Sequence, residues 1–141
     1  MSHSIRRGDP DDLVDVMRLF DGALLETDAN RVRARLVGER GSLLVSTTEG
    51  RLVGAIAVLT ADETSEELVW PDSVYIPAIA VQKARRGRGI GQSLIEAAAE
   101  WAGPRSLSAT FDERVQPFYA ACGFEIVRRE GRLWGRRPPV D

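Results

Sequence analysis

The order of the predicted elements indicates a single domain of the α/β (α+β) class that spans residues 1–141. A chain of this length is the size of one compact domain with one core. Its residues are 43% hydrophobic and 28% charged, which is an ordinary globular mixture. Strand and helix periodicities follow one another as strand, two helices, three strands, helix, strand, helix and two strands. These three observations together predict the fold class.

The first predicted helix carries a clear start signal. A short strand is predicted at residues 4–6, and Asp9 then occupies a helix N-cap with Pro10 at the first helical position. Apolar residues follow at helical spacing as far as Leu24, so one face of this helix should be buried. A second and more basic helix is predicted from about residue 30 to residue 37.

Three strands are predicted next. Residues 42–48 and 51–60 are rich in β-forming residues and are separated by a Glu-Gly turn, which indicates a hairpin. The second strand is apolar without alternation, as expected for a strand covered on both faces. After an acidic loop over about residues 61–72, the third strand covers residues 74–81. It contains Pro77, which removes a backbone donor, so we expect a bulge or a splay there.

The clearest helix is predicted at residues 89–101, because apolar residues share one of its faces and polar residues lie elsewhere. Gly103 and Pro104 end this helix. The rest of the chain is predicted to add a strand, a short helix and a strand hairpin, at residues 106–110, 112–122, 124–128 and 132–136.

The segment from residue 79 to residue 91 is the most informative part of the sequence. It reads IAVQKARRGRGIG, so that a strand ends, a basic glycine-rich turn follows and an amphipathic helix begins. A helix N-terminus offers unpaired N–H groups and a partial positive charge, which suit a phosphate group. Glycines let the backbone approach an anion, and arginines add charge and forked donors. The segment therefore predicts a phosphate-binding turn.

Two other phosphate-binding motifs fit this turn less well. A dinucleotide-binding fingerprint would need a third glycine where Gln92 stands, although Asp112 follows a strand about twenty residues on, where a ribose-binding acid would lie. Too little chain remains after Asp112 to complete a doubly wound sheet. A Walker loop is excluded, because no Gly-Lys-Ser/Thr follows the turn.

Two stretches of the sequence resemble motifs of the GNAT superfamily of N-acetyltransferases. Residues 86–91 (RGRGIG) are similar to its Arg/Gln-x-x-Gly-x-Gly/Ala pyrophosphate motif, and residues 79–81 resemble the strand that pairs with the pantetheine arm. Residues 118–124 (FYAACGF) are similar to its second motif, an aromatic-Tyr-x-x-x-Gly-Phe segment. The resemblance implies a mixed, mostly antiparallel twisted sheet that is splayed at the cofactor strand and flanked by about four helices.

The resemblance also implies an activity and a site. The activity is transfer of the acetyl group of acetyl-CoA to a primary amine by direct attack in a ternary complex, with no metal ion. Tyr119 is implied as the general acid that protonates the CoA thiolate. A backbone N–H near Ala80 and Val81 would stabilise the oxyanion. The residues implied to bind acetyl-CoA are Ile79, Ala80, Val81, Arg86, Gly87, Arg88, Gly89, Ile90, Gly91 and Gln92.

The sequence leaves the acceptor and the general base open. The acidic loop favours a cationic acceptor, which can be a small molecule or a protein amine. A non-catalytic acyl-CoA sensor is the alternative function, and such a module would bind CoA without needing a proton donor. Besides a water chain, the candidates for the general base are Glu63, Glu66, Glu67, Asp72 and Tyr75.

Charge and cysteine content restrict the partners and the compartment. The formal net charge of -2 argues against binding to nucleic acid or to an anionic membrane. Cys122 is the single cysteine, so no internal disulfide can form, and no apolar run approaches membrane-spanning length. These features predict a cytoplasmic protein. They do not decide whether the protein forms a homodimer.

Overall fold

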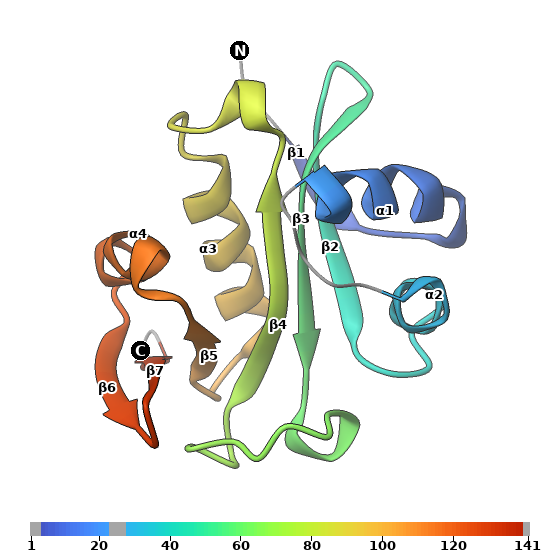
Figure 1. The fold of residues 1–141 in the computed structure, drawn as a ribbon. Coiled ribbons are helices and arrows are strands. Elements are labelled where there is room, and N and C mark those ends of the chain that lie inside the picture. The colour runs from blue at the N-terminus through green and yellow to red at the C-terminus, as the bar shows by residue number, and fades with distance from the viewer. Residues whose placement is uncertain (1–3, 23–27, 140–141) are drawn as a thin grey trace.

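A mixed sheet forms the centre of the computed structural model, which describes residues 4–22 and 28–139 (Figure 1). Within these ranges the sheet is 7-stranded, in the order β1-β2-β3-β4-β5-β7-β6. Neighbouring strands are antiparallel except for β4 and β5, which are parallel, so the predicted mixed, mostly antiparallel sheet is confirmed. The strands are β1 (Ser4–Arg7), β2 (Ser42–Thr48), β3 (Arg51–Leu59), β4 (Val74–Val81), β5 (Leu107–Phe111), β6 (Glu125–Arg129) and β7 (Arg132–Arg137).

Helices cover both faces of the sheet, with α1 and α2 on one side and α3 and α4 on the other (Figure 1). Each face has its own hydrophobic core. Fully buried Phe20 and Val32 belong to the core under α1 and α2, and fully buried Leu94 belongs to the core under α3 and α4. Strand β3 contributes Ala55 to one core and Ile56 to the other, which explains its apolar sequence without alternation. The helices are α1 (Leu13–Gly22), α2 (Ala29–Leu36), α3 (Ile90–Ala102) and α4 (Gln116–Ala121).

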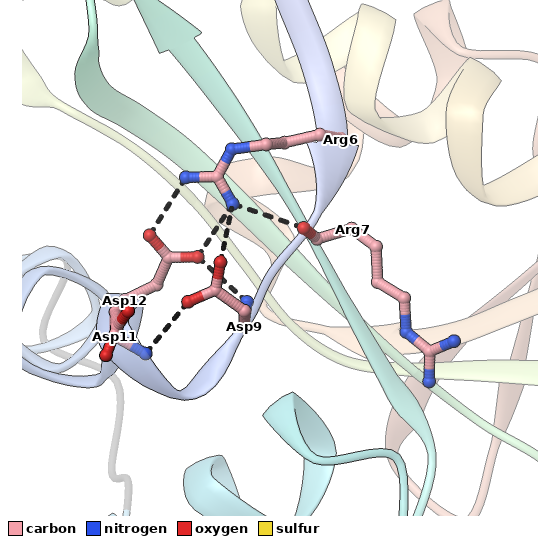
Figure 2. Close-up of polar contacts among 5 residues, drawn as sticks. All are labelled: Arg6, Arg7, Asp9, Asp11 and Asp12. Atoms are coloured by element: carbon pink, nitrogen blue, oxygen red, sulfur yellow. Dashed lines mark hydrogen bonds and ion pairs between the residues drawn. The ribbon is translucent and has the colours of Figure 1, made fainter.

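A small network of charged side chains fixes the start of α1 (Figure 2). Asp9 caps the 3₁₀ turn Pro10–Asp12, because its carboxylate accepts from the N–H of Asp11 at 2.8 Å. The Asp12 carboxylate accepts from the N–H of Asp9 at 2.9 Å and from the two terminal nitrogens of Arg6 at 2.8 and 2.9 Å. The predicted N-cap is confirmed, and the network joins β1 to the first helix.

The sheet opens between β4 and β5, beside Pro77. In the described ranges these strands pair at two positions, Tyr75 with Ser108 and the pair before it. Beyond Tyr75, β4 continues next to β3 alone. The register with β3 shifts at the same place, so that Ile76 and Pro77 of β4 lie opposite one residue of β3. The bulge and the splay predicted at Pro77 are therefore both present.

Most predicted boundaries agree with the structure. The strands predicted at residues 42–48 and 74–81 have the bounds of β2 and β4. The short helix predicted over residues 112–122 is divided into a 3₁₀ turn, Glu113–Val115, and α4. Leu24, the predicted end of the first helix, lies outside the described residues. None of the helices in the described part of the chain is long and apolar enough to cross a membrane.

Candidate active site

The predicted phosphate turn connects the end of β4 to the start of α3. Residues Lys83–Arg85 form a 3₁₀ turn, and Gly89 is the N-cap of α3. Gly87 and Gly89 have φ angles of 80° and 82°, in the left-handed region that favours glycine. A Cβ atom added to either glycine would meet no other heavy atom within 4 Å. The outer side of the turn therefore presents bare backbone to open space.

The first turn of α3 offers backbone donors beside these glycines. Ser93 donates the first hydrogen bond of the helix to the carbonyl of Gly89 at 3.0 Å. The N–H groups of Ile90, Gly91 and Gln92 consequently have no acceptor within the helix, and Gly89 provides no side-chain cap. Three such donors at the positive end of a 13-residue helix suit an anion such as a pyrophosphate.

The two arginines of the motif are held differently. Arg86 is exposed, and its Nε donates to the carbonyl of Val81 at 3.1 Å, so its side chain folds back over the end of β4. Arg88 lies between the two left-handed glycines and is exposed. The Arg86 side chain is thus held by a hydrogen bond before any ligand binds. Arg88 instead contributes positive charge to the surface of the turn.

Hydrogen bonding to β3 shows how the backbone of β4 is oriented beside the gap. The N–H of Gln82 donates to the carbonyl of Val53 on β3 at 2.8 Å. Backbone groups of alternate residues in a strand point in the same direction. The N–H and C=O of Ala80, which lies opposite Ala55, therefore also point to β3.

The alternation gives different roles to the residues predicted to pair with the pantetheine arm. Ile79 and Val81 direct their N–H and C=O groups away from β3, into the gap left by β5. The bond from Arg86 to the Val81 carbonyl agrees with this orientation. The backbone groups of Ala80 are used by β3, so the geometry favours Ile79 and Val81 over Ala80 for binding a chain in the gap.

Tyr119, the predicted general acid, lies in α4 within a cluster of aromatic rings. The residue is 6% exposed. Its ring stacks on that of Phe111, with centroids 4.2 Å apart and planes inclined by 8°, and it meets Phe118 and Phe124 edge-on at 5.2 Å. Burial, supplemented by the nearby Tyr75, raises the pKa of Tyr119 above the ordinary 10.0. The phenol therefore stays protonated at neutral pH, as a proton donor must.

The two motifs predicted from the sequence meet at Gly91. A Cβ atom at this position would lie 2.9 Å from the ring of Phe118, which itself packs against Tyr119. The phosphate turn and the helix of the predicted acid are therefore in contact. Gly91 was predicted to let the backbone approach an anion, but the structure shows that the space beside it is needed by Phe118. Its N–H remains available at the start of α3.

Among the predicted bases, Glu63 has a structural role. Its carboxylate accepts from the N–H of Gly41 at 2.7 Å and from both the N–H and the hydroxyl of Thr60 at 2.8 Å. Burial alone would raise the pKa of Glu63, but the hydrogen bonds from Thr60 and Gly41 lower it below its ordinary value. A carboxylate held in this way is a poor base. Glu67 and Asp72 are exposed.

Tyr75 lies at the narrow end of the gap, and the charge of Glu66 acts on it. Tyr75 is the last residue of β4 that pairs with β5, is 7% exposed, and has its ring centroid 6.3 Å from that of Trp134. Burial and the negative charge of Glu66 raise the pKa of Tyr75, while Arg132 and Arg35 oppose the shift. Arg132 also donates to the Glu66 carboxylate at 2.6 Å. These charges therefore act on one buried phenol.

Helix α2 brings Arg35 close to the same phenol. Arg35 is half-buried in the last turn of the helix, and burial followed by the charge of Arg31 lowers its pKa from 12.5, while Tyr75 raises it. Within the described ranges, none of the ion pairs involves Arg35. The helix thus supplies a positive charge that acts on Tyr75.

A cavity of about 490 Å³ lies at the end of β5, beside the hairpin of β6 and β7. Its wall includes Phe111, which stacks on Tyr119, and Arg132, which binds Glu66, so the cavity adjoins both groups. The other lining residues are Thr110, Asp112, Glu113, Arg128, Gly131 and Leu133. The part of the chain that the structure describes contains no cluster of His, Cys, Asp or Glu that could hold a metal ion.

Phe111 and Arg35 are site residues that the sequence analysis did not single out. For Phe111 a signal existed, because alternation along β5 places it on the same face as Leu107 and Ala109, toward α3 and α4. For Arg35 no local signal existed. Its effect on Tyr75 depends on how α2 packs over the sheet, which no neighbouring residue in the sequence reports.

Known acetyltransferases are similar to this chain. The family model described as an acetyltransferase (GNAT) domain matches residues 39–126. A curated relative, the L-2,4-diaminobutyric acid acetyltransferase of Nocardia farcinica (strain IFM 10152), is 28% identical over 103 residues, which is 72% of this chain and 50% of the relative. The chain therefore spans about half the length of that relative.

Solved structures agree with the fold. NAA60 of Arabidopsis thaliana, in complex with acetyl-CoA, has a TM-score of 0.78 at 16% identity and covers 97% of this chain and 98% of its own. A GNAT-family acetyltransferase of Streptococcus agalactiae 2603 has a TM-score of 0.76 at 18% identity and covers 99% of this chain and 96% of its own. At this level of identity the likeness concerns the fold.

The fold and the candidate site thus combine a splayed mixed sheet with a basic glycine-rich turn at a helix N-terminus. Because the family model covers more than half of its residues, the chain belongs to the GNAT acetyltransferase family. The family resemblance seen in residues 86–91 and 118–124 is thus confirmed.

Proposed function

We propose that residues 1–141 act as one acyltransferase domain that transfers the acetyl group of acetyl-CoA to a primary amine by direct attack in a ternary complex. The observation that carries this proposal is the open edge of β4, which leads from Tyr75 to the unpaired donors of α3. An extended chain that ends in a pyrophosphate matches this path. The pantetheine arm binds the backbone of Ile79 and Val81, and the pyrophosphate binds the first turn of α3.

The phosphate end is bound by the remaining predicted residues of the turn. Gly87 and Gly89 keep its surface bare, and the N–H groups of Ile90, Gly91 and Gln92 donate to the phosphate oxygens. Arg86 and Arg88 add positive charge from side chains that are already exposed there. Ala80 supports the strand through β3 and contributes its small side chain to the core below.

The reaction that we propose forms one C–N bond and breaks one C–S bond. The neutral amine attacks the thioester carbonyl carbon, and a backbone N–H of β4 that faces the gap stabilises the oxyanion. As the C–S bond breaks, its electron pair leaves with sulfur, and Tyr119 donates a proton to the thiolate. The attacking nitrogen, which carries a positive charge after the attack, gives up one N–H proton to water and becomes the amide nitrogen. Solvent then returns a proton to Tyr119.

The amine must lose a proton before or during the attack. A lysine-like amine, with a pKa of about 10.4, is neutral in roughly one part in a thousand at pH 7.4. Of the predicted bases, we favour Glu66 for this proton, since its charge acts on Tyr75 and its carboxylate is bound by the exposed side chain of Arg132, whereas Glu63 is occupied by backbone donors. Tyr75 and water can pass the proton to Glu66.

The acceptor is proposed to be a small amine that also carries a carboxylate. Arg35 places a positive charge beside Tyr75, where a carboxylate of the acceptor would pair with it. The curated relative is named for L-2,4-diaminobutyric acid, which has two amines and one carboxylate. Chemistry of this kind would use the negative charge of Glu66 for the amine and the positive charge of Arg35 for the carboxylate.

Two measurements test the proposed function. Acetyl-CoA should raise the melting temperature of the protein while NAD should not, because a ligand that binds the folded state stabilises it by mass action. Thiol release from acetyl-CoA should then be followed with L-2,4-diaminobutyrate, with 1,3-diaminopropane, which lacks the carboxylate, and with a peptide amine. Acetyl-CoA binding without thiol release across the panel would favour the sensor, and an absence of binding would refute both functions.

A further inference from the structure

Tyr119 is held by rings rather than by hydrogen bonds. The side-chain hydrogen bonds of the described ranges do not include its hydroxyl, and this oxygen is not among the fully buried ones, so it keeps some access to solvent although the residue is only 6% exposed. The Phe111 ring lies parallel to the face of Tyr119, with centroids 4.2 Å apart, while Phe118 and Phe124 contact its ring at 79° and 89°. The face contact with Phe111 is the closest of the three, and it limits the tilt of the Tyr119 ring.

Gly135 on β7 makes room for this arrangement. A Cβ atom at Gly135 would lie 3.0 Å from the ring of Phe111 and 3.2 Å from that of Phe124. The φ angle of Gly135 is not in the left-handed region, so its backbone does not require glycine. The absence of a side chain there lets the two phenylalanine rings close on either side of Tyr119.

Phe111 also covers one face of the Tyr119 ring. It is half-buried, because one side of it lies against Tyr119 and another forms part of the wall of the cavity at the end of β5. A residue that served the core alone would not need to border an open cavity. Removal of this ring would both free the Tyr119 ring to tilt and admit water to it.

We propose that Phe111, seated over Gly135, is the positioning residue that aims Tyr119 at the sulfur of the leaving group and limits the access of water to its ring. The inference rests on the proposed role of Tyr119 as the proton donor. Because a hydroxyl without a hydrogen-bond partner can be oriented only through its ring, the stacked contact fixes the direction of the donated proton. A misplaced donor lowers turnover while acetyl-CoA binding is retained.

The first test is an alkaline titration of Tyr119. The chain has 2 tyrosines, so a Tyr75→Phe background leaves Tyr119 as the single phenol, and its ionisation can be followed by tyrosinate absorbance. In that background, Phe111→Leu and Gly135→Ala should ionise at lower pH than the parent, because the ring is wetted. Phe111→Tyr adds a second phenol to this background, so its titration should show two ionisations. The one that belongs to Tyr119 should occur at the same pH as in the parent.

The second test separates positioning from stability in the otherwise unchanged chain. Phe111→Leu and Gly135→Ala should lower kcat for thiol release with L-2,4-diaminobutyrate by about tenfold or more, while KM for acetyl-CoA stays unchanged. Phe111→Tyr keeps the aromatic ring and should therefore retain the kcat of the parent. Phe124→Leu is the matched control, since it removes an equal ring that touches the edge of Tyr119. It should lower the melting temperature while leaving kcat much closer to that of the parent.

The outcomes distinguish this inference from the proposed function. If Phe111→Leu lowers the melting temperature but changes neither the tyrosinate titration nor kcat, Phe111 is a core residue and the inference is wrong. If Tyr119→Phe retains full turnover, the proposed acid is wrong, whereas the titration still reports whether Phe111 shields Tyr119. Should Phe111→Leu fail to fold, the smaller change Gly135→Ala decides the question by the same two readouts.

Discussion

Tyr119 combines a buried ring with a proposed role that requires it to exchange a proton with a ligand. Since burial raises its pKa above 10.0, the phenol stays protonated throughout the range in which acetyl-CoA assays are run. Tyr119→Phe keeps the stacked ring, so acetyl-CoA affinity and fold should be preserved. Turnover should fall by about a hundredfold or more, the scale of a lost general acid.

The raised pKa of Tyr119 also predicts how kcat depends on pH. With the pKa of Tyr119 displaced upward, kcat of the wild-type protein should show no descending limb from this residue below pH 10. A steady-state pH profile of wild type and Tyr119→Phe checks both statements. Turnover close to that of wild type, or a descending limb that disappears in the variant below pH 10, would contradict this assignment.

Arg86 and Arg88 offer a matched pair of substitutions. Alanine at Arg88 should weaken acetyl-CoA binding by about 1–3 kcal/mol and leave the ligand-free melting temperature unchanged, because Arg88 is exposed. Arg86→Ala should weaken binding similarly and also cost up to about 1 kcal/mol of stability, because its hydrogen bond to Val81 is lost. Calorimetric titration and thermal melts measure the two effects. Equal stability losses in both variants would contradict the difference between the two side chains.

The junction of β1 and α1 should show an acid-sensitive contribution to stability. A hydrogen bond from Arg6 lowers the pKa of Asp12 below 3.8 despite partial burial. A carboxylate whose pKa is lowered by folding stabilises the protein above its unfolded pKa, and this contribution is lost as the pH falls through the folded pKa. Asp12→Asn should therefore reduce the free energy of unfolding by about 1–3 kcal/mol at neutral pH and by less below pH 3.8.

Urea denaturation at a series of pH values measures this dependence. Asp11 lies one residue away and accepts no hydrogen bond from Arg6, so Asp11→Asn is the matched control and should change stability little. A loss of stability that is the same at neutral and at acidic pH would mean that the Asp12 carboxylate acts through packing rather than through charge.

The two glycines at the start of α3 should respond differently to substitution. Gly91→Ala places a methyl group against Phe118, so the ligand-free protein should lose about 1–3 kcal/mol of stability, and Phe118→Leu in the same chain should recover part of it. Gly89→Asn keeps a residue that tolerates the left-handed region, so stability should change little while acetyl-CoA binding weakens. Denaturation of the single and double variants, together with acetyl-CoA titration, checks this. Unchanged binding in Gly89→Asn would place the pyrophosphate elsewhere.

Elements with strong local signals were predicted with nearly correct bounds. Strands β2 and β4 have the predicted ends, because turn residues flank them on both sides, and Asp9 caps the helix start that its sequence indicated. The predicted helix over residues 112–122 was less accurate. Its first turn is a 3₁₀ turn, because the Asp112 side chain caps Arg114 while Pro117 stands at the start of α4.

The site was predictable where it is local in sequence and not where it is assembled from distant segments. Residues 86–91 carry their phosphate-binding character in glycine and arginine alone, and the structure leaves that turn open. By contrast, the role of Glu63 depends on Gly41, the space beside Gly91 depends on Phe118, and the environment of Tyr75 depends on Arg35 and Arg132. No periodicity reports these tertiary contacts, so the sequence could not rank the candidate bases.

Strands β4 and β5 pair at only two positions in the described ranges, and this has a consequence for the hydrogen exchange of the β4 amides. Amides in the interior of a sheet normally exchange their hydrogens slowly, yet the N–H groups of Ile79 and Val81 face a gap rather than a strand. They should exchange quickly in the ligand-free protein, while Ala80, bonded to β3, exchanges slowly. With acetyl-CoA bound, Ile79 and Val81 should become as protected as Ala80, since the pantetheine arm then completes the sheet as a missing strand. Deuterium exchange with residue resolution measures this, and equal protection of the three amides in the absence of ligand would show that the gap is closed in solution.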